Sequence, residues 1–211
     1  MIEIKQKNTG EVLLQFEGDS LEGAHLQGKE LPEADFTEMN LSGIDLGNAN
    51  LREADFTGAL LEDATFHSAC LNGATLVDAE VARADFTDAF IQKATLSNLK
   101  AHRAVFRYAK MSECDLSGAD LTGADMSIAD LRGNLSGANF EQADLRGSDL
   151  RGADLSDANL SGANLTNAKM ADATLNRTRM DGTIGTHGQR MGAHVAAPRK
   201  KSKRPWWQIW S

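Results

Sequence analysis

The chain has 211 residues, a formal net charge of −8 and an aromatic content of 6%. This length suits one domain, and two cysteines provide neither a disulfide framework nor a paired metal-ligand spacing, which fits a reducing compartment. No run of about 18 apolar residues could span a membrane and no signal peptide is evident, so we expect a cytoplasmic protein.

Residues 1–18 have the pattern of a β-hairpin. Residues 2–5 alternate between apolar and charged side chains, Asn8-Thr9-Gly10 is typical of a turn, and residues 12–16 are again apolar. A stack of repeats that ended in solvent would expose a sheet edge and its apolar core. We therefore predict that this hairpin caps the repeats after it.

A five-residue repeat occupies residues 19–183. Every fifth residue from Leu21 to Leu131 is Leu, Phe, Met, Ile or Val, except Ala101, and the spacing resumes from Leu135 to Met180. The residue two positions before each of these central residues is usually alanine. Helical faces recur every 3.6 residues and strand faces every 2, so a period of five with a polar or Gly-containing pair predicts a short strand followed by a turn. Pairs such as Ser117-Gly118 supply the positive φ of a type II turn.

The spacing of the phenylalanines predicts how many sides each coil has. Phe66, Phe86 and Phe106 recur at a constant interval of four repeats, so a coil with four sides would stack them on one face. The residue before each central residue, such as Asp120, then points outward. On this basis we expect Asp120→Ala to be nearly silent and an aspartate in place of the central residue to abolish folding.

Runs such as Ala119-Asp120-Leu121-Thr122-Gly123 resemble the A(D/N)LXX motif of pentapeptide repeat proteins. The resemblance covers about residues 19–183. It implies an all-β fold, a right-handed quadrilateral parallel β-helix of about eight coils, with the central residue and the preceding alanine inside. A fold of this kind carries little information on activity.

No motif in the sequence indicates catalysis. The five histidines lack metal-ligand spacing, and the glycines follow the repeat and do not open a helix after a strand, as a phosphate-binding loop would. The aspartates before the central residues point outward, whereas acid–base catalysis needs an enclosed site. We therefore predict a protein without enzymatic activity and without a cofactor.

Residues 89–112 differ from the rest of the repeat region, because they contain no acidic residue and five lysines or arginines. This basic belt also has apolar residues at outward positions, as expected for a place where a protein partner binds. The alternative is a degenerate coil whose charges only offset neighbouring aspartates. The candidate partner-binding residues are Phe90, Lys93, Lys100, His102, Arg103, Arg107, Tyr108 and Lys110.

The rest of the repeat region is acidic, with 15 acidic residues against 3 basic ones in residues 19–88. Some pentapeptide repeat proteins are similar to B-form DNA in width and charge, bind DNA gyrase or topoisomerase IV, and protect against quinolones or related toxins. The resemblance therefore implies a type II topoisomerase as an alternative partner, although the basic belt interrupts a DNA-like field. We rank a protein-binding scaffold first and DNA mimicry second, with no direct binding of nucleic acid by the repeats. The acidic surface candidates are Asp35, Asp55, Asp125, Asp130, Asp144 and Asp149.

Two further irregularities follow the belt. Leu131 and Leu135 are one residue closer than the repeat requires, and Gly133 stands where alanine is expected, so we predict a local kink or bulge.

Residues 184–211 then form a basic tail with six lysines or arginines, no acidic residue and all three tryptophans. The tail either is flexible, folds back over the last coil, or docks on a partner or an anionic surface such as the inner membrane. Its anchor candidates are Lys200, Lys201, Lys203, Arg204, Trp206, Trp207 and Trp210.

Overall fold

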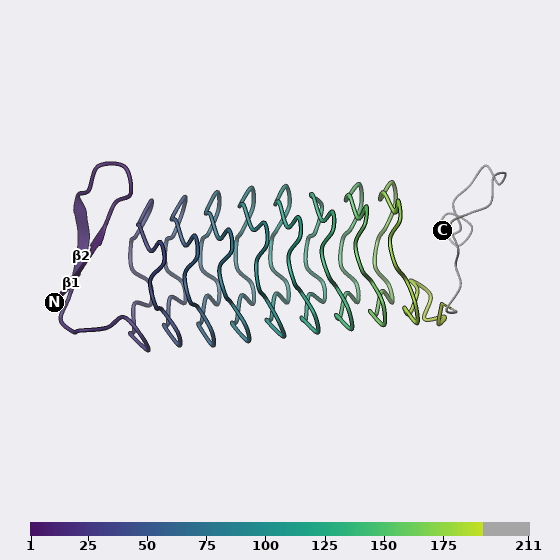
Figure 1. Cartoon of the computed structure of the whole chain (residues 1–211), viewed down its shortest axis with the longest axis horizontal. Helices are drawn as coiled ribbons and strands as arrows, with labels where there is room; N and C mark the ends of the chain where they lie inside the picture. The colour runs from purple at the N-terminus through teal and green to yellow at the C-terminus, as the bar shows by residue number, and fades with distance from the viewer. Residues whose placement is uncertain (192–211) are drawn as a thin grey trace.

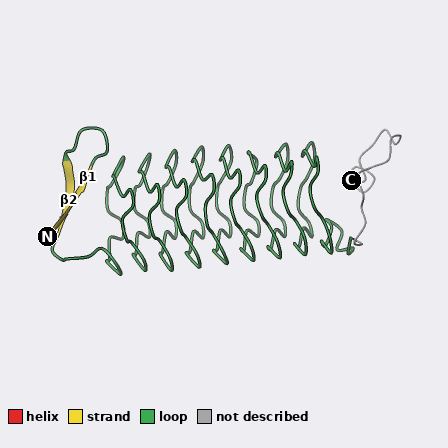
Figure 2. Ribbon diagram, viewed as in Figure 1, coloured by secondary structure: helices red, strands yellow, loops and turns green. Residues whose placement is uncertain are grey.

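The computed structural model describes residues 1–191 and shows a rod of stacked coils with a β-hairpin at one end (Figure 1). The hairpin consists of β1 (Ile2–Lys5) and β2 (Val12–Phe16), which pair antiparallel with an irregularity between Ile4 and Lys5. The rod is the predicted all-β, right-handed quadrilateral β-helix. Each side of a coil contributes only a single bridge, so its segments are drawn as loops in Figure 2.

Parallel backbone ladders hold successive coils together on all four sides. Asp45, Thr65 and Asp85 form one such ladder, in which each residue bridges its counterpart four repeats later. The N–H group of Leu46 donates to the carbonyl oxygen of Thr65 at 2.8 Å, and the N–H group of Thr65 donates to Ile44 at 2.8 Å. A ladder that returns after four repeats confirms the predicted four sides.

We number the faces by their first central residue: face 1 from Leu21, face 2 from Leu26, face 3 from Leu31 and face 4 from Phe36. The central residues and the alanines two positions before them fill the interior, where most have no exposed surface. The predicted phenylalanine columns are present: the rings of Phe66 and Phe86 stack at 4.7 Å between centroids, and those of Phe36 and Phe56 at 4.8 Å. Such regular columns pack the interior of the rod.

Each corner except the shortened one after Leu131 is a turn in which the second residue after the central one has a positive φ. The N–H group of Ala49, for example, donates to the carbonyl oxygen of Leu46 at 3.1 Å across the turn, and Asn48 between them has φ 57°. Glycine occupies only some of these positions, and the other residues there are mostly Asp, Asn, Glu and other polar types. Asparagine and aspartate tolerate the left-handed region better than most residues, so the rod does not depend on glycine at every corner.

The short repeat between Leu131 and Leu135 removes one turn residue without interrupting the ladder. Asn134 still bridges both Asp115 and Asp154, and Gly133 takes the inward position that alanine occupies elsewhere. The predicted kink or bulge is therefore a shortened corner, and the ladder partners across it are one residue closer in sequence than elsewhere.

The two ends of the rod differ. At the N-terminal end the N–H group of Asp35 donates to the carbonyl oxygen of Lys5 at 2.8 Å, and Ile4 is fully buried, so the hairpin covers the first coil. At the other end Ile184 still bridges Asn164, and the chain then turns back so that the N–H group of Met191 donates to Thr183 at 2.7 Å. This return covers one side of the last coil only.

Candidate interaction surface

The residues of the basic belt are spread over all four faces, because the belt is slightly longer than one coil. Phe90 and Lys110 are ladder partners on face 3, and Tyr108 lies at the corner between faces 2 and 3. Lys100 lies on face 1 and Lys93 at the corner between faces 3 and 4. His102 and Arg103 follow Lys100 at the end of face 1, and Arg107 lies on face 2. The belt is therefore not a single contact surface.

Three of the five cations in the belt pair with carboxylates on neighbouring coils. The Lys100 Nζ atom lies 2.7 Å from Glu80, and the Arg107 guanidinium lies 2.5 Å from Asp125. Lys93 lies 3.8 Å from Glu113. The hydrogen bond to Glu80 raises the pKa of Lys100, as expected for an ion pair. These three cations therefore offset carboxylates on the adjacent coils.

Arg103 and Lys110 have no carboxylate partner within residues 1–191. These two cations remain available to a ligand, whereas the other three would first have to leave an ion pair. The difference could not be read from the sequence alone, since it depends on which acid lies beside each cation on the adjacent coil.

Three large apolar side chains are exposed near the corner between faces 2 and 3. Phe90 is 46% exposed and Tyr108 is 41% exposed. Ile128 is 52% exposed and occupies the same corner position as Tyr108, one coil further along. We call these three residues the apolar corner. Ile128 is not among the predicted residues, because it lies outside the basic belt. The signal that could have identified it is an apolar side chain at the second position of the turn.

Tyr108 and Ile128 also have a strained backbone. Their φ values are 62° and 61°, in the left-handed region that is unfavourable for bulky and β-branched side chains. Every other non-glycine residue with positive φ in the described chain is polar or charged. Both the exposure and the strain thus set these two residues apart from the other corners of the rod.

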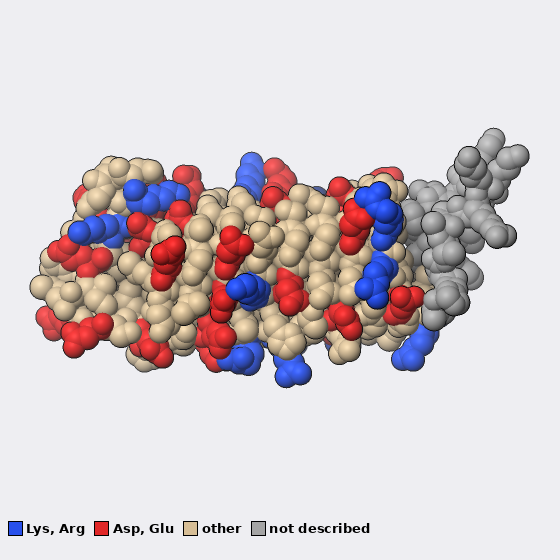
Figure 3. Space-filling model, viewed as in Figure 1, with Lys and Arg blue, Asp and Glu red and all other residues tan. Residues whose placement is uncertain are grey.

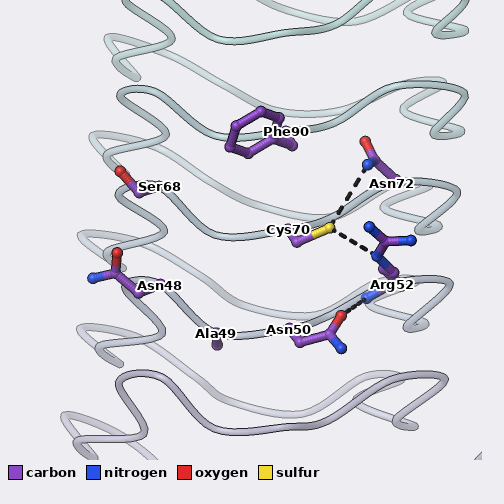
Figure 4. Close-up of a pocket in the computed structure, with 8 residues that line it drawn as sticks. All are labelled: Asn48, Ala49, Asn50, Arg52, Ser68, Cys70, Asn72 and Phe90. Atoms are coloured by element: carbon purple, nitrogen blue, oxygen red, sulfur yellow. Dashed lines mark hydrogen bonds between the residues drawn. The ribbon is translucent and has the colours of Figure 1, made fainter.

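A shallow depression of about 280 Å³ lies beside Phe90 on face 3 (Figure 4). It forms where the small side chain of Cys70 stands in the ladder between Asn50 and Phe90. The Nε atom of Arg52 donates to the Cys70 sulfur at 3.2 Å, and the Asn72 amide donates to it at 3.6 Å. The depression continues the apolar corner along face 3, and its lining combines Phe90, Ala49 and Cys70 with polar side chains.

The acidic candidates divide into two groups. Asp35 and Asp55 are neighbours in the face 4 ladder and have no cationic partner among the described residues. The other four each pair with an arginine: Asp125 with Arg107, Asp130 with Arg132, Asp144 with Arg146 and Asp149 with Arg151. Figure 3 shows separate red patches and fewer blue ones among uncharged residues on the side of the rod that it presents. These four ion pairs interrupt the negative charge in this part of the rod.

The aspartates before the central residues also stabilise the corners. The Oδ1 atom of Asp125 accepts the N–H group of Ser127 at 3.0 Å, and Asp154 accepts that of Ser156 at 2.9 Å. Asparagine does the same, as Asn134 accepts the N–H group of Ser136 at 3.1 Å. This local hydrogen bond explains why the repeat prefers Asp or Asn at that position.

The tail anchor candidates, Lys200 to Trp210, lie outside the described residues. Within residues 1–191, no group of three or more His, Cys, Asp or Glu side chains is arranged to hold a metal ion. The same part of the chain contains no helix that could span a bilayer.

A comparison with solved structures finds several proteins to which this chain is similar. HetL, a pentapeptide repeat protein involved in heterocyst differentiation regulation from the cyanobacterium Nostoc sp. strain PCC 7120, is 25% identical with a TM-score of 0.54; the match covers 81% of this chain and 92% of HetL. QnrB1, a plasmid-mediated fluoroquinolone resistance protein, is 20% identical over 79% of this chain and 86% of its own, with a TM-score of 0.31. A pentapeptide repeat protein from the Arabidopsis thaliana thylakoid lumen is 27% identical, with a TM-score of 0.24, over 63% of this chain and 69% of its own.

No curated protein sequence matches the chain. The family model described as pentapeptide repeats matches in 8 copies, over residues 40–77, 102–133, 134–172 and 148–184. These matches cover more than half of the chain and coincide with the coils of the rod. The chain therefore belongs to the pentapeptide repeat family.

Proposed function

We propose that the protein is a non-enzymatic scaffold that binds a protein partner through its apolar corner, Phe90, Tyr108 and Ile128. The main support for this proposal is that Tyr108 and Ile128 combine exposed apolar side chains with a positive φ. Glycine or asparagine at those corners would avoid the exposed apolar surface and reduce the strain. Features that reduce stability in this way are typical of binding sites.

Residues beside the corner supply the polar contacts that a protein interface needs. Lys110 lies next to Phe90 in the face 3 ladder without a carboxylate partner in the described chain, so it is free to pair with a partner's acid. Aromatic residues at the centre of a contact and unpaired polar groups at its edge are the usual composition of such interfaces.

Exchange of the strained apolar residues tests this proposal. The double variant Tyr108→Asn, Ile128→Asn should fold at least as stably as the wild type, because asparagine tolerates positive φ. It should also lose a partner that the wild type captures from the native host. Leu60→Asn is the matched control, since Leu60 is 41% exposed on face 1, away from the corner. Retention of the partner by the double variant, or its equal loss from the Leu60 control, contradicts the proposed surface.

A further inference from the structure

Within residues 1–191, three of the four sides at the C-terminal end of the rod have an unpaired sheet edge. In the preceding coil the N–H groups of Leu150 and Gly152 donate to the carbonyl oxygens of Lys169 and Ala171 at 2.8 and 2.9 Å. The equivalent N–H groups of the last coil donate to no acceptor within residues 1–191. They belong to Met170, Asp172, Leu175, Arg177, Met180 and Gly182. An edge of this kind is a template for pairing with another segment of chain.

The core is also less well covered at this end. The first central residues, Leu21, Leu26 and Leu31, are at most 3% exposed because the hairpin packs over that end. Leu175 and Met180, the last central residues, are only partly buried. A solenoid needs a cap at each end to keep its core from water, and the described chain supplies a complete cap only at the N-terminal end.

The rest of the chain starts at this end and has the composition of a cap. Residues 192–211 follow Met191, whose N–H group is bonded to the last coil, and their number equals that of one coil. Their sequence lacks the five-residue pattern of the rod. They end in Pro-Trp-Trp-Gln-Ile-Trp-Ser, which includes all the tryptophans of the protein.

Charge favours the same arrangement. The cations between Arg199 and Arg204 immediately precede the aromatic residues. Asp172 and Asp181 lie exposed on the last coil, and neither has an ion-pair partner among the described residues. A segment that brings its aromatic end over Leu175 and Met180 would place its basic part near these carboxylates.

We propose that residues 205–210 of the same chain close the open end of the rod, with the tryptophans packed on Leu175 and Met180. The segment is long enough for this, since a fully extended chain of about 20 residues reaches roughly 65 Å, several times the width of one coil. Closing the end buries the apolar surface of the last coil and pairs its edge, so the rod does not add further copies end to end. The inference is independent of the apolar corner.

Tryptophan fluorescence tests the proposal directly, because residues 1–191 contain no tryptophan and the signal reports the last segment alone. The full chain should show blue-shifted emission that acrylamide quenches poorly, unchanged on tenfold dilution. The emission should shift to the red in the same denaturant transition as the far-UV circular dichroism of the rod. If the emission maximum without denaturant already equals that of the unfolded chain, the proposal is wrong.

Two other outcomes also overturn it. A blue shift that disappears on dilution means that the tryptophans pack on a second copy, and one that appears only with phosphatidylglycerol vesicles means that they bind a membrane. Variants then locate the contact. Leu175→Asp should shift the emission to the red while circular dichroism is unchanged, and Asn176→Asp, at the exposed neighbouring position, should not. If Leu175→Asp unfolds the rod, Met180→Glu is a second test of the same surface. If neither variant shifts the emission to the red, the tryptophans do not pack on this surface.

Discussion

The backbone of Gly133 lies directly against the backbone of Cys114 on the preceding coil. A Cβ atom at position 133 would overlap the Cys114 carbonyl oxygen and stand 3.1 Å from its nitrogen. Both residues occupy the inward position that alanine fills elsewhere, and the ladder continues through Asn134. Deletion of one corner residue has therefore drawn the two coils together at this point, and only glycine fits.

We expect Gly133→Ala to destabilise the rod by at least about 2 kcal/mol, because the overlapping atoms are backbone and cannot rotate away. Gly152→Ala is the control: that corner has φ 68° but no atom within 4 Å of the added Cβ, so only backbone strain of about 1–2 kcal/mol applies. Urea unfolding measured by circular dichroism compares the two. Equal unfolding midpoints for the two variants would contradict the close approach.

The two cysteines should differ sharply in reactivity. Cys114 is buried, its Sγ atom lies 2.7 Å from the carbonyl oxygen of Ile91, and burial raises the pKa of its thiol to about 12. Cys70 is only partly buried at the floor of the depression beside Arg52. Since the thiolate is the reactive form, we expect one fast thiol in the native protein and two after unfolding.

Titration with an aromatic disulfide reagent, followed spectroscopically, counts these thiols. Cys70→Ser should abolish the fast reaction without changing the slow one. Fast reaction of both thiols in the wild type would mean that the coil around Cys114 opens far more readily than its burial indicates.

The sequence was sufficient to predict the coil, because one period is repeated often enough that each position has a single environment. Leu121, Ala119 and the phenylalanine columns lie where the period places them. The candidate site was harder to predict, since its properties depend on residues one coil apart. The pairing of Arg107 with Asp125, and the position of Ile128 beside Tyr108, follow from coil geometry and not from neighbouring positions in the sequence.

Asp120→Ala tests whether the residue before the central one stabilises its corner. The Asp120 Oδ1 atom accepts the N–H group of Thr122 at 3.1 Å and its hydroxyl at 2.5 Å, and also the amide of Asn139 at 3.3 Å. The sequence-based expectation of a silent substitution leaves these hydrogen bonds out. We now expect a loss of about 1 kcal/mol in the free energy of unfolding.

Asp120→Asn is the matched control, because an asparagine oxygen accepts the same turn hydrogen bond at Asn134. It should lose less stability than Asp120→Ala in the same urea titration. If the alanine variant is as stable as the wild type, the corner does not depend on this side chain.

Ion pairs within single repeats should make the stability of the rod depend on pH in the acid range. The hydrogen bond from Arg132 lowers the pKa of Asp130, and that from Arg151 lowers the pKa of Asp149. A carboxylate with a lower pKa in the folded than in the unfolded state stabilises the fold above its unfolded pKa of about 3.9. That contribution is lost as the pH falls through the folded value, because the native state must then bind the proton.

We therefore expect Asp130 and Asp149 to change the urea midpoint little as the pH falls from 7 to about 5, and to decrease it below about pH 4. The double variant Arg132→Gln, Arg151→Gln should be less stable at neutral pH and should lose less stability on acidification, since only the backbone N–H groups of residues 132 and 151 would then lower the two pKa values. Arg179→Gln is the control, because Arg179 has no ion pair among the described residues. An acid transition equally steep in the double variant would show that carboxylates elsewhere on the rod determine its acid sensitivity.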